Sequence, residues 1–484
     1  MDARLGANDM STVLGIDSST QATKIELRDA ASGALLAAGR AAHPPTGSPR
    51  SEQDPQAWWA AFAAAMDAAG SPSFDAVSVA AQQHGMVLLD DFGAALRPAK
   101  LWNDTESAPD AEWLLSRLDG GASAWAKACG SVPVAAFTIT KLSWLHRTEP
   151  AAFDRAAHVL LPHDWLTWKL TGEFVTDRGD ASGTGYWSPA TGTYRSDLLD
   201  IVDAAMDWSP LLPQVLDPLA NVPACHHAGA VVACGTGDNM AAALGVGLRA
   251  GDVCVSIGTS GTIFSVADRP TADATGAVAG FADATGRFLP LVCTLNATKV
   301  TDTIARWLDV DHAGLDALAL AAPTGTVGPV LVPYFDGERT PNRPNATGAL
   351  TELRTDVTRE QLARSAIEGV VCGLLDGLDA LRATGVPTPA DRGDRRLVLV
   401  GGGARSAAYR QVLADLTGLA VHVPADDELV ARGACVQAAA ALHQTPAPEI
   451  LEAWPTPAPS ITEPSPGSAD RAATVRGAYA AARS

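Results

Sequence analysis

The chain has 484 residues, and 47% of them are hydrophobic. A chain of this length can bury more than one hydrophobic core, so we expect a large enzyme of two domains. Its 35 Lys and Arg residues against 54 Asp and Glu residues give a formal net charge of -19 at pH 7. Because no block of basic residues interrupts this composition, we expect neither a nucleic acid nor an anionic membrane surface as a partner.

The sequence also bears on location and on thiol chemistry. Residues 1–12 are polar or small, and no run of about 18 apolar residues occurs, so we expect a soluble, unsecreted, cytoplasmic protein. The seven cysteines are scattered and odd in number, which argues against a disulfide framework. Cys225, His226, His227 and Cys234 lie close together, but their spacing fits no common zinc pattern. We interpret these cysteines as buried or incidental thiols.

One pattern occurs twice and predicts a duplicated domain beginning. It consists of an apolar run, a polar turn and a segment in which apolar and polar residues alternate, and it spans residues 13–28 and again residues 253–266. Such a pattern is typical of a buried strand followed by a half-buried one. Each turn is rich in Ser, Thr or Gly and offers amides and hydroxyls, so the two turns can embrace a phosphate chain from opposite sides.

Between and after these units, apolar runs alternate with helical patterns, as α/β layers require. Asp54 and Pro55 predict the N-cap and first position of one helix, and Thr358 with Gln361 predicts a capping box at the start of another. The residues expected to face the core are Trp59, Phe62 and Met66 in the first helix, and Ile367, Val371, Leu374, Leu378 and Leu381 in the second.

Two further strands are predicted to end at polar or glycine turns. Residues 76–81 lead into residues 82–85, and residues 397–400 lead into residues 401–406. The carboxyl ends of parallel strands carry ligand sites, and a buried strand that feeds a glycine turn and a helix is typical of nucleotide sites. Residues 445–484 are expected to form an extended tail, rich in Pro, Ser and Thr, with a final helix.

Asp238 is the first candidate for catalysis. It follows the apolar run 230–233 within Gly-Thr-Gly-Asp-Asn, so a carboxylate lies at the end of a strand, beside glycines that let a ligand approach. Phosphoryl transfer to an alcohol needs a group that accepts the proton of the hydroxyl, and an aspartate can do so. The alternative is that Asp238 caps a helix that begins near Met240. The local sequence leaves both interpretations open.

Asp17 presents a similar choice, because it can coordinate Mg²⁺ or cap the turn that follows it. The duplicated turn favours the functional interpretation. Residues 401–403 are all glycine but match no dinucleotide fingerprint, and the chain has no P-loop. These glycines suit contact with an adenine or ribose, or else close packing of a strand on a helix.

The remaining polar clusters suggest a sugar site. His84 stands at a strand end beside two glutamines and a glycine, groups that suit hydrogen bonding to a polyol, although a lone histidine is more often a satisfied core residue. Trp102, Asn103 and Asp104 add an aromatic face and two polar groups. Asn296 and residues 336–341 are further polar clusters that we interpret as loops.

In this order along the chain, these segments resemble the FGGY carbohydrate kinases. The resemblance spans nearly the whole chain and is closest to the branch that phosphorylates D-xylulose. Its motifs are Gly15-Ile16-Asp17 with Ser19, Thr20 and Lys24, Ser51 to Pro55 with Trp58 and Trp59, Gln83-His84-Gly85, Leu101 to Asp104, Lys141-Leu142, Leu160-Leu161-Pro162 with Asp164, Thr171-Gly172-Glu173, Asp177 with Asp180 to Thr184, Gly237-Asp238-Asn239, Ser256 to Gly261, Gly337 to Pro341, and Gly401 to Ser406.

The resemblance implies an α/β fold of two actin-like (ribonuclease H-like) ATPase domains around a central cleft. We expect an N-terminal domain over residues 1–246, a C-terminal domain over 247–444, and the tail and final helix over 445–484. The implied reaction transfers the γ-phosphoryl group of ATP, with Mg²⁺, to the 5-hydroxyl of D-xylulose. Ribulose, glycerol or gluconate are alternative acceptors, and a non-catalytic ATP-binding sugar sensor is an alternative class. The expected partners are a small sugar and ATP, with a homodimer as a candidate assembly.

The resemblance also implies roles for individual residues. Asp238 would be the base, and Asp17 and Asp238 would lie at the metal. The sugar pocket would consist of Gln83, His84, Trp102, Asn103, Asp104 and Asn239. The nucleotide would contact Ser19, Thr20, Gly258, Thr259, Ser260, Gly261, Thr262, Gly401, Gly402, Gly403 and Ala404. Two departures stand out: residues 18–20 lack a glycine that many members have before Thr20, and Gln83 occupies a position where many have Met.

Overall fold

The computed structural model describes residues 11–47, 49–222, 229–323, 328–391, 393–455 and 457–484. The chain forms two compact units, and each is assembled from three segments. Unit 1 comprises Met1–Gly247, Asp268–Leu289 and Glu428–Thr456, and unit 2 comprises Leu248–Ala267, Pro290–Asp427 and Pro457–Ser484. Within the described residues, no helix is long and apolar enough to cross a membrane.

Unit 1 is built on a mixed sheet with the strand order β13-β14-β5-β1-β2-β3. Its strands are β1 (Thr12–Ser18), β2 (Ala22–Asp29), β3 (Leu35–Ala42), β5 (Ala76–Ala81), β13 (Asn221–Val222) and β14 (Val231–Ala233). β1 runs antiparallel to β2 and parallel to β5. The short strand β15 (Thr236–Gly237) pairs with the end of β5. The predicted strands over residues 13–16, 24–28 and 76–81 are thereby confirmed.

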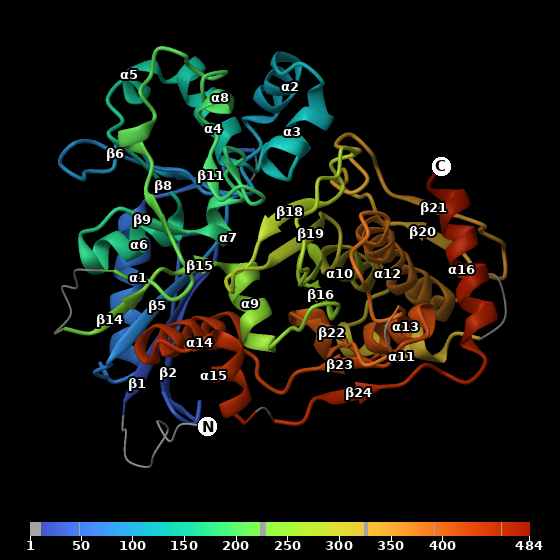
Figure 1. Cartoon of the computed structure of the whole chain (residues 1–484). Coiled ribbons are helices and arrows are strands. Elements are labelled where there is room, and N and C mark those ends of the chain that lie inside the picture. The colour runs from blue at the N-terminus through green and yellow to red at the C-terminus, as the bar shows by residue number, and fades with distance from the viewer. Residues whose placement is uncertain (1–10, 48, 223–228, 324–327, 392, 456) are drawn as a thin grey trace. The chain divides into compact units, whose positions relative to one another are not determined.

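Two helices of unit 1 position the end of this sheet. Figure 1 shows α14 (Leu429–His443) beside β1 and α9 (Asp238–Val246). The two helices cross where they carry glycines: a Cβ on Gly245 would lie 1.9 Å from the carbonyl oxygen of Leu429, and one on Gly433 would lie 1.8 Å from that of Ala241. Because only glycine fits there, α14 lies directly against the helix that begins with Asp238.

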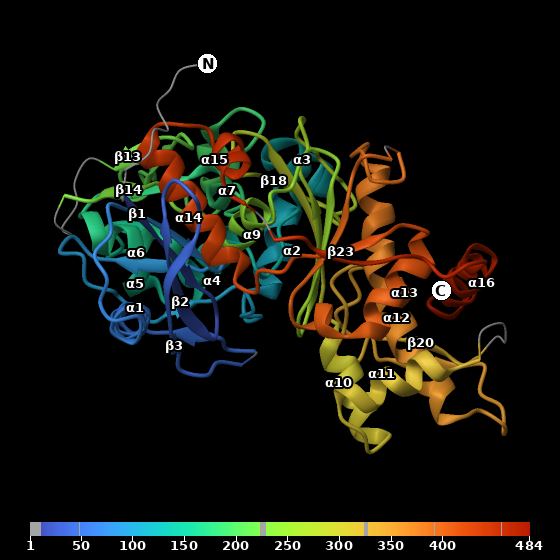
Figure 2. The same ribbon diagram turned by 90° about the horizontal axis from the view of Figure 1, so that it is seen from below.

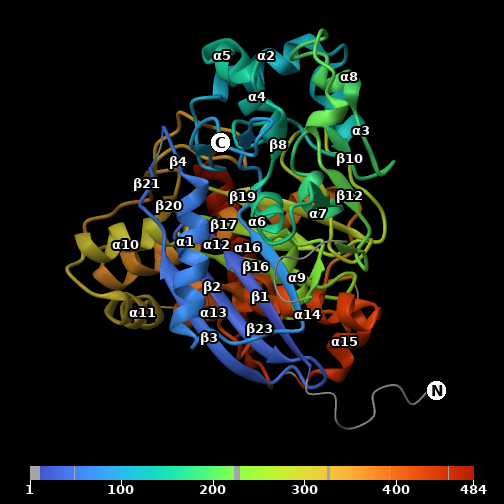
Figure 3. The same ribbon diagram turned by 90° about the vertical axis from the view of Figure 1, so that its left-hand side faces the viewer.

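On the other part of the sheet, α1 (Pro55–Ala68) packs against β2 and β3, as Figure 3 shows. Asp54 is its N-cap, with its side chain accepting a hydrogen bond from the amide of Gln56, so this predicted start is confirmed. Of the predicted core face, Phe62 is buried, and Trp59 and Met66 are partly buried and pack against the core. The prediction missed Trp58, which is fully buried. Two adjacent tryptophans leave the phase of a helix face ambiguous.

The rest of unit 1 consists of short helices and strands outside this sheet. The helices are α2 (Ala108–Arg117), α3 (Gly121–Cys129), α4 (Thr138–Thr148), α5 (Pro150–Phe153), α6 (Pro162–Thr171), α7 (Arg178–Ala181), α8 (Ser196–Leu199) and α15 (Ala447–Ala453). The strands are β4 (Glu52–Gln53), β6 (Val87–Leu89), β7 (Ala99–Lys100), β8 (His158–Leu160), β9 (Val175–Asp177), β10 (Trp187–Ser188), β11 (Thr193–Tyr194), β12 (Gln214–Leu216) and β18 (Ala279–Ala282), with a 3-10 turn η1 (Ser209–Leu211).

Unit 2 repeats the plan of unit 1. Its sheet places strands in the order β19-β17-β16-β22-β23-β24, and β16 runs antiparallel to β17 and parallel to β22. These strands are β16 (Val253–Ile257), β17 (Gly261–Ser265), β19 (Phe288–Thr294), β22 (Leu397–Val400), β23 (Val421–Val423) and β24 (Ser460–Thr462), with a separate pair β20 (Val330–Val332) and β21 (Ala349–Thr351). The first strand of each unit therefore pairs in the same way, which confirms the predicted duplication.

The helices of unit 2 are α10 (Thr298–Trp307), α11 (His312–Ala321), α12 (Arg359–Ala383), α13 (Ala407–Thr417) and α16 (Ser468–Ala482), with the 3-10 turn η2 (Gly402–Arg405). Figure 2 shows α12 next to α13. The predicted capping box of Thr358 and Gln361 is present at the start of α12, and all five predicted core residues of this helix are buried. The final helix is confirmed as α16, but the tail before it is not wholly extended, because α15 begins directly after Pro446, with Pro448 in its first turn.

Candidate functional site

Asp238 begins helix α9 rather than capping it. Gly237 occupies the N-cap position and makes no side-chain cap hydrogen bond. The preceding Thr236 and Gly237 pair with Ala80 and Ala81 at the end of β5, so Asp238 stands at the carboxyl edge of the sheet. The interpretation of Asp238 as a helix cap is therefore wrong, and its carboxylate is left to other partners.

Those partners engage one oxygen of Asp238. Oδ1 accepts hydrogen bonds from the backbone amide of Asn239 at 2.8 Å and from its side-chain Nδ2 at 2.9 Å. Within the described residues, Oδ2 accepts no hydrogen bond. Burial raises the pKa of Asp238 to about 7, and the nearby carboxyls of Asp17 and Asp180 raise it further against the two Asn239 bonds. A carboxyl that titrates near neutrality suits a general base.

Gln83 reaches the same group through Asn239. Its Oε1 accepts a hydrogen bond from Asn239 Nδ2 at 2.9 Å. Gln83 is 4% exposed, and a Cβ on Gly237 would lie 2.7 Å from its Cγ, so its stem lies directly on the backbone before Asp238. The structure therefore brings Gln83, Asn239 and Asp238 together.

His84 is held next to Gln83 in a left-handed backbone conformation, with φ of 65°. Its Nδ1 lies 2.7 Å from the carbonyl oxygen of Gly183, and because a carbonyl oxygen only accepts, Nδ1 carries the proton. The ring packs on Phe137 and Phe281, with centroid distances of 4.9 and 5.5 Å. Non-glycine residues rarely adopt this conformation without a compensating reason, and such positions often mark functional sites.

Trp102 and Asn103, two of the three residues predicted at 102–104, are each held by a side-chain hydrogen bond. Trp102 Nε1 donates to the hydroxyl oxygen of Thr20 at 2.9 Å, and that hydroxyl donates to Gln82 Oε1 at 3.2 Å. Asn103 Oδ1 accepts a hydrogen bond from the hydroxyl of Ser51 at 2.7 Å. The aromatic face of Trp102 is thus fixed beside Thr20.

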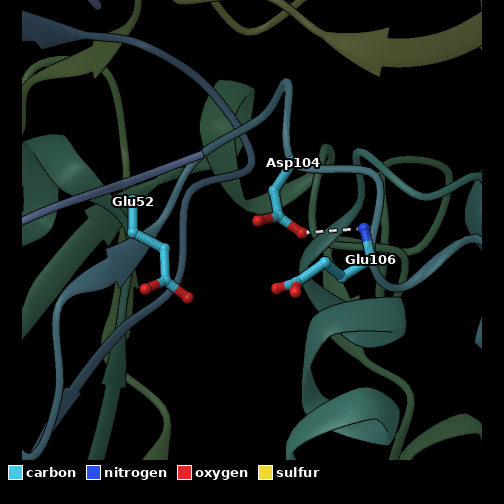
Figure 4. Close-up of side chains that lie close together, drawn as sticks. All are labelled: Glu52, Asp104 and Glu106. Carbon is cyan, nitrogen blue, oxygen red and sulfur yellow. Dashed lines mark hydrogen bonds between the residues drawn. The ribbon is translucent and has the colours of Figure 1, made fainter. Parts of the chain in front are cut away.

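Asp104 is fully buried and differs from its two neighbours. Figure 4 shows its carboxylate close to those of Glu52 and Glu106. Lys100 Nζ lies 2.8 Å from Asp104, 2.6 Å from Glu106 and 3.5 Å from Glu52, and it also lies 3.9 Å from the ring centre of Trp144. The lysine ammonium therefore supplies positive charge to all three carboxylates, and Arg97 adds a second cation at Glu52, with its Nη2 2.5 Å from Oε1.

Asp17 ends the first strand and is buried. Lys24 Nζ lies 3.6 Å from its Oδ2 and 2.6 Å from Glu428. Burial raises the pKa of Asp17 to about 6, although Lys24 lowers it. Its Oδ1 has no hydrogen-bond partner within the described residues. The turn is closed by Ser19, whose amide and hydroxyl both donate to the carbonyl oxygen of Ala22, so Asp17 does not cap it.

A buried charge cluster lies beneath Asp238, and sequence reasoning missed its organisation. His163 Nδ1 lies 2.8 Å from Asp180, and its Nε2 lies 3.1 Å from Asp164 and 3.8 Å from Asp177. Burial lowers the pKa of His163, but the three carboxylates outweigh this and raise it to about 9. A Cβ on Gly235 would lie 2.6 Å from the ring, so the turn that leads to Asp238 lies directly on this cluster.

We call this group the His163 cluster, and it comprises His163, Asp164, Asp177 and Asp180. Three of its members, Asp164, Asp177 and Asp180, lie in the family-like motifs, but no local pattern joins them. Burial raises the pKa of Asp164 to about 7 and that of Asp177 to about 6, while His163 opposes both shifts.

In unit 2 the two predicted nucleotide turns lie side by side at the ends of β16 and β22. Gly401 has φ of 84°, and a Cβ on it would lie 2.7 Å from the carbonyl oxygen of Ile257. A Cβ on Gly403 would lie 2.4 Å from the Ile257 side chain. Close packing therefore explains why residues 401 and 403 are glycine. Gly402 is exposed, and among the described residues a Cβ on it would meet only Arg405 within 4 Å.

The turn at residues 258–262 is tied to the start of α10. Gly258 donates to the carbonyl oxygen of Ser260, and its own carbonyl oxygen accepts from the amide of Thr298, both at 2.9 Å. Thr259 is exposed, while Gly261 is buried and Thr262 half-buried in β17. The 3-10 turn η2 lies beside this turn, and Ala404 within η2 is buried. Residues 258–262 and η2 together form one edge of the unit 2 sheet.

Two other predicted clusters have different outcomes. Asn296 Nδ2 donates to Glu338 Oε2 at 2.9 Å and to the carbonyl oxygen of Gly337 at 2.7 Å, so those two loops meet. Cys225, His226 and His227 lie outside the described residues. The remaining member of that group, Cys234, is a buried free thiol.

Comparison with known proteins identifies the family. Residues 12–245 match the N-terminal domain of the FGGY family of carbohydrate kinases, and residues 253–442 match its C-terminal domain. A xylulose kinase of Streptomyces rubiginosus is 44% identical over 468 residues, covering 95% of this chain and 94% of the relative.

Solved structures agree with this match. A xylulose kinase from Bifidobacterium adolescentis superposes with a TM-score of 0.86 at 39% identity, covering 99% of this chain and 100% of that one. A gluconate kinase from Lactobacillus acidophilus superposes with a TM-score of 0.89 at 23% identity and covers 98% of this chain and 97% of that one, which speaks for the fold alone. The chain therefore belongs to the FGGY family of carbohydrate kinases, with their two-domain actin-like fold, and is a phosphotransferase that acts on an alcohol group.

Proposed function

We propose that this enzyme transfers the γ-phosphoryl group of ATP to the 5-hydroxyl of D-xylulose and releases D-xylulose 5-phosphate and ADP. The observation that carries the mechanism is the state of Asp238. One of its oxygens is held by two donors from Asn239, the other accepts no hydrogen bond within the described residues, and its pKa is raised to about 7. The substrate follows from relatives named xylulose kinase, including the one from Streptomyces rubiginosus.

In this reaction Oδ2 of Asp238 accepts the proton of the sugar hydroxyl while the oxygen bonds to the γ-phosphorus. The bond from that phosphorus to the bridging oxygen of ADP breaks at the same time, and ADP leaves with the electron pair. Asn239 supports the step, because its two hydrogen bonds fix Oδ1 and so orient Oδ2. A base held in place before the reaction loses little entropy in reaching its transition state.

The residues present fit a magnesium ion. The buried Asp17 Oδ1 has no hydrogen-bond partner within the described residues, and carboxylate oxygens are ligands that Mg²⁺ prefers. We propose that Asp17 and Asp238 would lie at the ion, directly or through water. Mg²⁺ would neutralise charge on the phosphates when bound. The raised pKa values of both carboxyls, to about 6 and about 7, reflect negative charge and burial that a cation relieves.

ATP is the donor implied by the family. We propose that Ser19 and Thr20 of unit 1, and residues 258–262 and 401–404 of unit 2, contact it. Exposed Gly402 suits this role because it leaves the backbone open to a flat ligand.

For the sugar, we propose contacts with Gln83, His84, Trp102, Asn103 and Asn239. For Asp104, the geometry favours a supporting role over a direct contact with the sugar. Both its oxygens already have partners, Ser51 and Lys100 on one and the amide of Glu106 on the other. We propose that Asp104 holds the turn that presents Trp102 and Asn103.

The test is a panel of acceptors with ATP and Mg²⁺: D-xylulose, ribulose, glycerol and gluconate, with ADP release and sugar phosphate both measured. We expect D-xylulose to give the highest kcat/KM. A clear preference for another acceptor contradicts the proposed substrate, and sugar binding without phosphate transfer to any acceptor favours the sensor.

A homodimer and a cytoplasmic location stay predictions, checked by light scattering and by cell fractionation.

A further inference from the structure

We infer that Gln83 is a positioning residue that links the buried His163 cluster to the catalytic carboxylate of Asp238. This inference rests on the proposed role of Asp238 as the base. It goes beyond a sugar contact for Gln83, because it assigns the side chain a task that it performs through Asn239.

The first link is a shared amide. Asn239 Nδ2 donates to Gln83 Oε1 and to Asp238 Oδ1, at 2.9 Å each. Only the NH₂ group of Asn239 can serve two acceptors, so this geometry fixes which way its amide faces. The same geometry requires Gln83 to present its oxygen to Asn239 and to turn its NH₂ group away.

The second link is on that opposite side. Gln83 Nε2 is buried and has no partner in hydrogen-bond geometry among the described residues, and the same holds for Asp180 Oδ1. The segment that carries Gln83 and His84 nevertheless packs on the one that carries Asp180, because a Cβ on Gly183 would lie 2.6 Å from His84 Nδ1 and 3.3 Å from the carbonyl oxygen of Asp180. In keeping with this, Gln83 lowers the pKa of Asp180 against the effect of burial. The other oxygen of Asp180 is occupied by His163 Nδ1 at 2.8 Å. The amide of Gln83 therefore lies between a carboxylate and the NH₂ group of Asn239.

This arrangement allows one orientation of the Gln83 amide. If the amide were rotated by half a turn, its oxygen would face the carboxylate of Asp180 and its NH₂ group would face that of Asn239. Both contacts would be repulsive, and the hydrogen bond from Asn239 Nδ2 to Gln83 Oε1 would be lost. Asp180, itself paired with His163, thus dictates how Gln83 and Asn239 face Asp238.

Close packing also holds the side chain of Gln83, which is 4% exposed. A Cβ on Gly237 would lie 2.7 Å from Gln83 Cγ and 3.1 Å from Met240 Sδ. Gln83 is therefore held by its stem on the backbone next to Asp238 as well as by its amide. A side chain of similar size without the amide keeps this packing but releases Asn239.

A sugar contact alone would have a different signature. Gln83 Oε1 already accepts a hydrogen bond from Asn239, so only Nε2 could donate one to the sugar. Loss of that single sugar contact would raise KM for the sugar. Loss of positioning would lower kcat, because Asp238 Oδ2 would no longer be aimed at the hydroxyl. A small misplacement of a catalytic group costs up to about a hundredfold in rate.

The experiment compares Gln83→Met and Gln83→Glu with wild type, using the acceptor that wild type phosphorylates fastest in the panel. Gln83→Met keeps the size and removes the amide, and we expect kcat to fall by roughly tenfold to a hundredfold with little change in KM. Gln83→Glu keeps the oxygen that faces Asn239 but places a second carboxylate oxygen against Asp180, so we expect kcat to fall as well.

The double variant Gln83→Glu with Asp180→Asn tests the coupling directly. It preserves the net charge and reverses the polarity of the pair, since the amide introduced at position 180 could donate to the carboxylate introduced at position 83 while still accepting from His163. We expect it to recover most of the kcat lost in Gln83→Glu alone. Gln437→Met is the matched comparison: Gln437 is another buried glutamine of unit 1, and it bonds Ser78, Cys234 and the carbonyl oxygen of Gly235 in the turn before Asp238, rather than Asn239.

The outcomes separate the alternatives. If Gln83→Met raises only KM, or changes neither constant, the positioning role is overturned. If Gln83→Glu has wild-type kcat, or the double variant recovers nothing, the coupling to Asp180 is overturned. Thermal unfolding of each variant checks that it is folded, and the kcat of Gln437→Met shows how much activity is lost when a buried amide beside the turn is removed without releasing Asn239. A wild-type enzyme that prefers another acceptor overturns only the proposed substrate.

Discussion

The hydroxyl of Thr236 donates to Asp177 Oδ2 at 2.8 Å, and so connects the strand before Asp238 to the His163 cluster. Asp177 Oδ2 also accepts from the amide of Gly179 at 2.9 Å. The turn before Asp238 is thus bonded to a buried charge network as well as packed on it, which makes its position sensitive to changes deep in unit 1.

Removing this hydroxyl tests the connection. Thr236→Val keeps the shape but leaves a buried carboxylate oxygen short of a donor, so we expect a loss of about 1–3 kcal/mol in the free energy of unfolding. Thr236→Ser keeps the hydroxyl and is the control. Urea denaturation measures both, and equal midpoints for the two variants would show that the bond contributes little.

Asp238 itself gives the largest expected effect. Because Asp238 is the proposed acceptor of the proton of the sugar hydroxyl, Asp238→Ala should lower kcat by about a hundredfold to ten-thousandfold while sugar binding is largely retained. Stopped assays of sugar phosphate measure kcat, and calorimetry measures sugar binding. Near-normal turnover would remove Asp238 from the role of base.

Activity should depend on pH through the same carboxyl. The base works only when ionised, and its pKa is raised to about 7, so kcat/KM for the sugar should fall as the pH drops below about 7. Initial rates between about pH 5 and 9, with recovery of activity checked after return to about pH 7.5, provide the measurement. A profile that stays flat across the acidic range contradicts the prediction.

Stability should depend on pH through His163. The folded-state pKa of about 9 lies above the ordinary value of 6.5, so the folded protein keeps a proton that the unfolded chain releases. The stabilisation is complete below pH 6.5 and is lost as the pH rises through about 9. Asp164, with its pKa raised to about 7, acts in the same direction at lower pH.

The corresponding measurement is the urea midpoint at pH 6.5 and at about pH 9. We expect wild type to lose stability across this interval and His163→Asn to lose less of it. His312→Asn, at an exposed histidine of unit 2, is the control and should follow wild type. An equal pH dependence in all three proteins would exclude His163 as the source.

Lys100 supplies a prediction about the acidic group in Figure 4. Lys100→Met removes the ammonium that lies between Glu52, Asp104 and Glu106 and leaves buried negative charge uncompensated. Breaking a buried pair in this way costs about 3–5 kcal/mol, which urea denaturation resolves. Lys127→Met, at an exposed position, should be neutral. Unchanged stability of Lys100→Met would mean that the carboxylates do not depend on the lysine.

The sequence predicted the strands and turns of both units because apolar runs and glycine turns are local signals. It also placed Asp238 at the end of a strand but left open whether this residue caps the next helix. The sequence did not predict Gly237 as the N-cap, since a helix start is uncertain by a residue or two without the backbone geometry. The His163 cluster escaped notice because His163 shows no pattern with Asp177 and Asp180, which only folding brings to it. In the same way, no local signal indicates that residues 428–456 return to unit 1.

That return has a consequence for how the protein is made. The glycine crossing of α9 and α14 joins a helix that begins at residue 238 to one that begins at residue 429. During synthesis, nearly two hundred further residues must therefore leave the ribosome after the start of α9 before the packing partner of this helix exists. Nascent chains that stop before α14 should present Asp238 on an unsupported helix, exposed to chaperones and proteases rather than ready for catalysis.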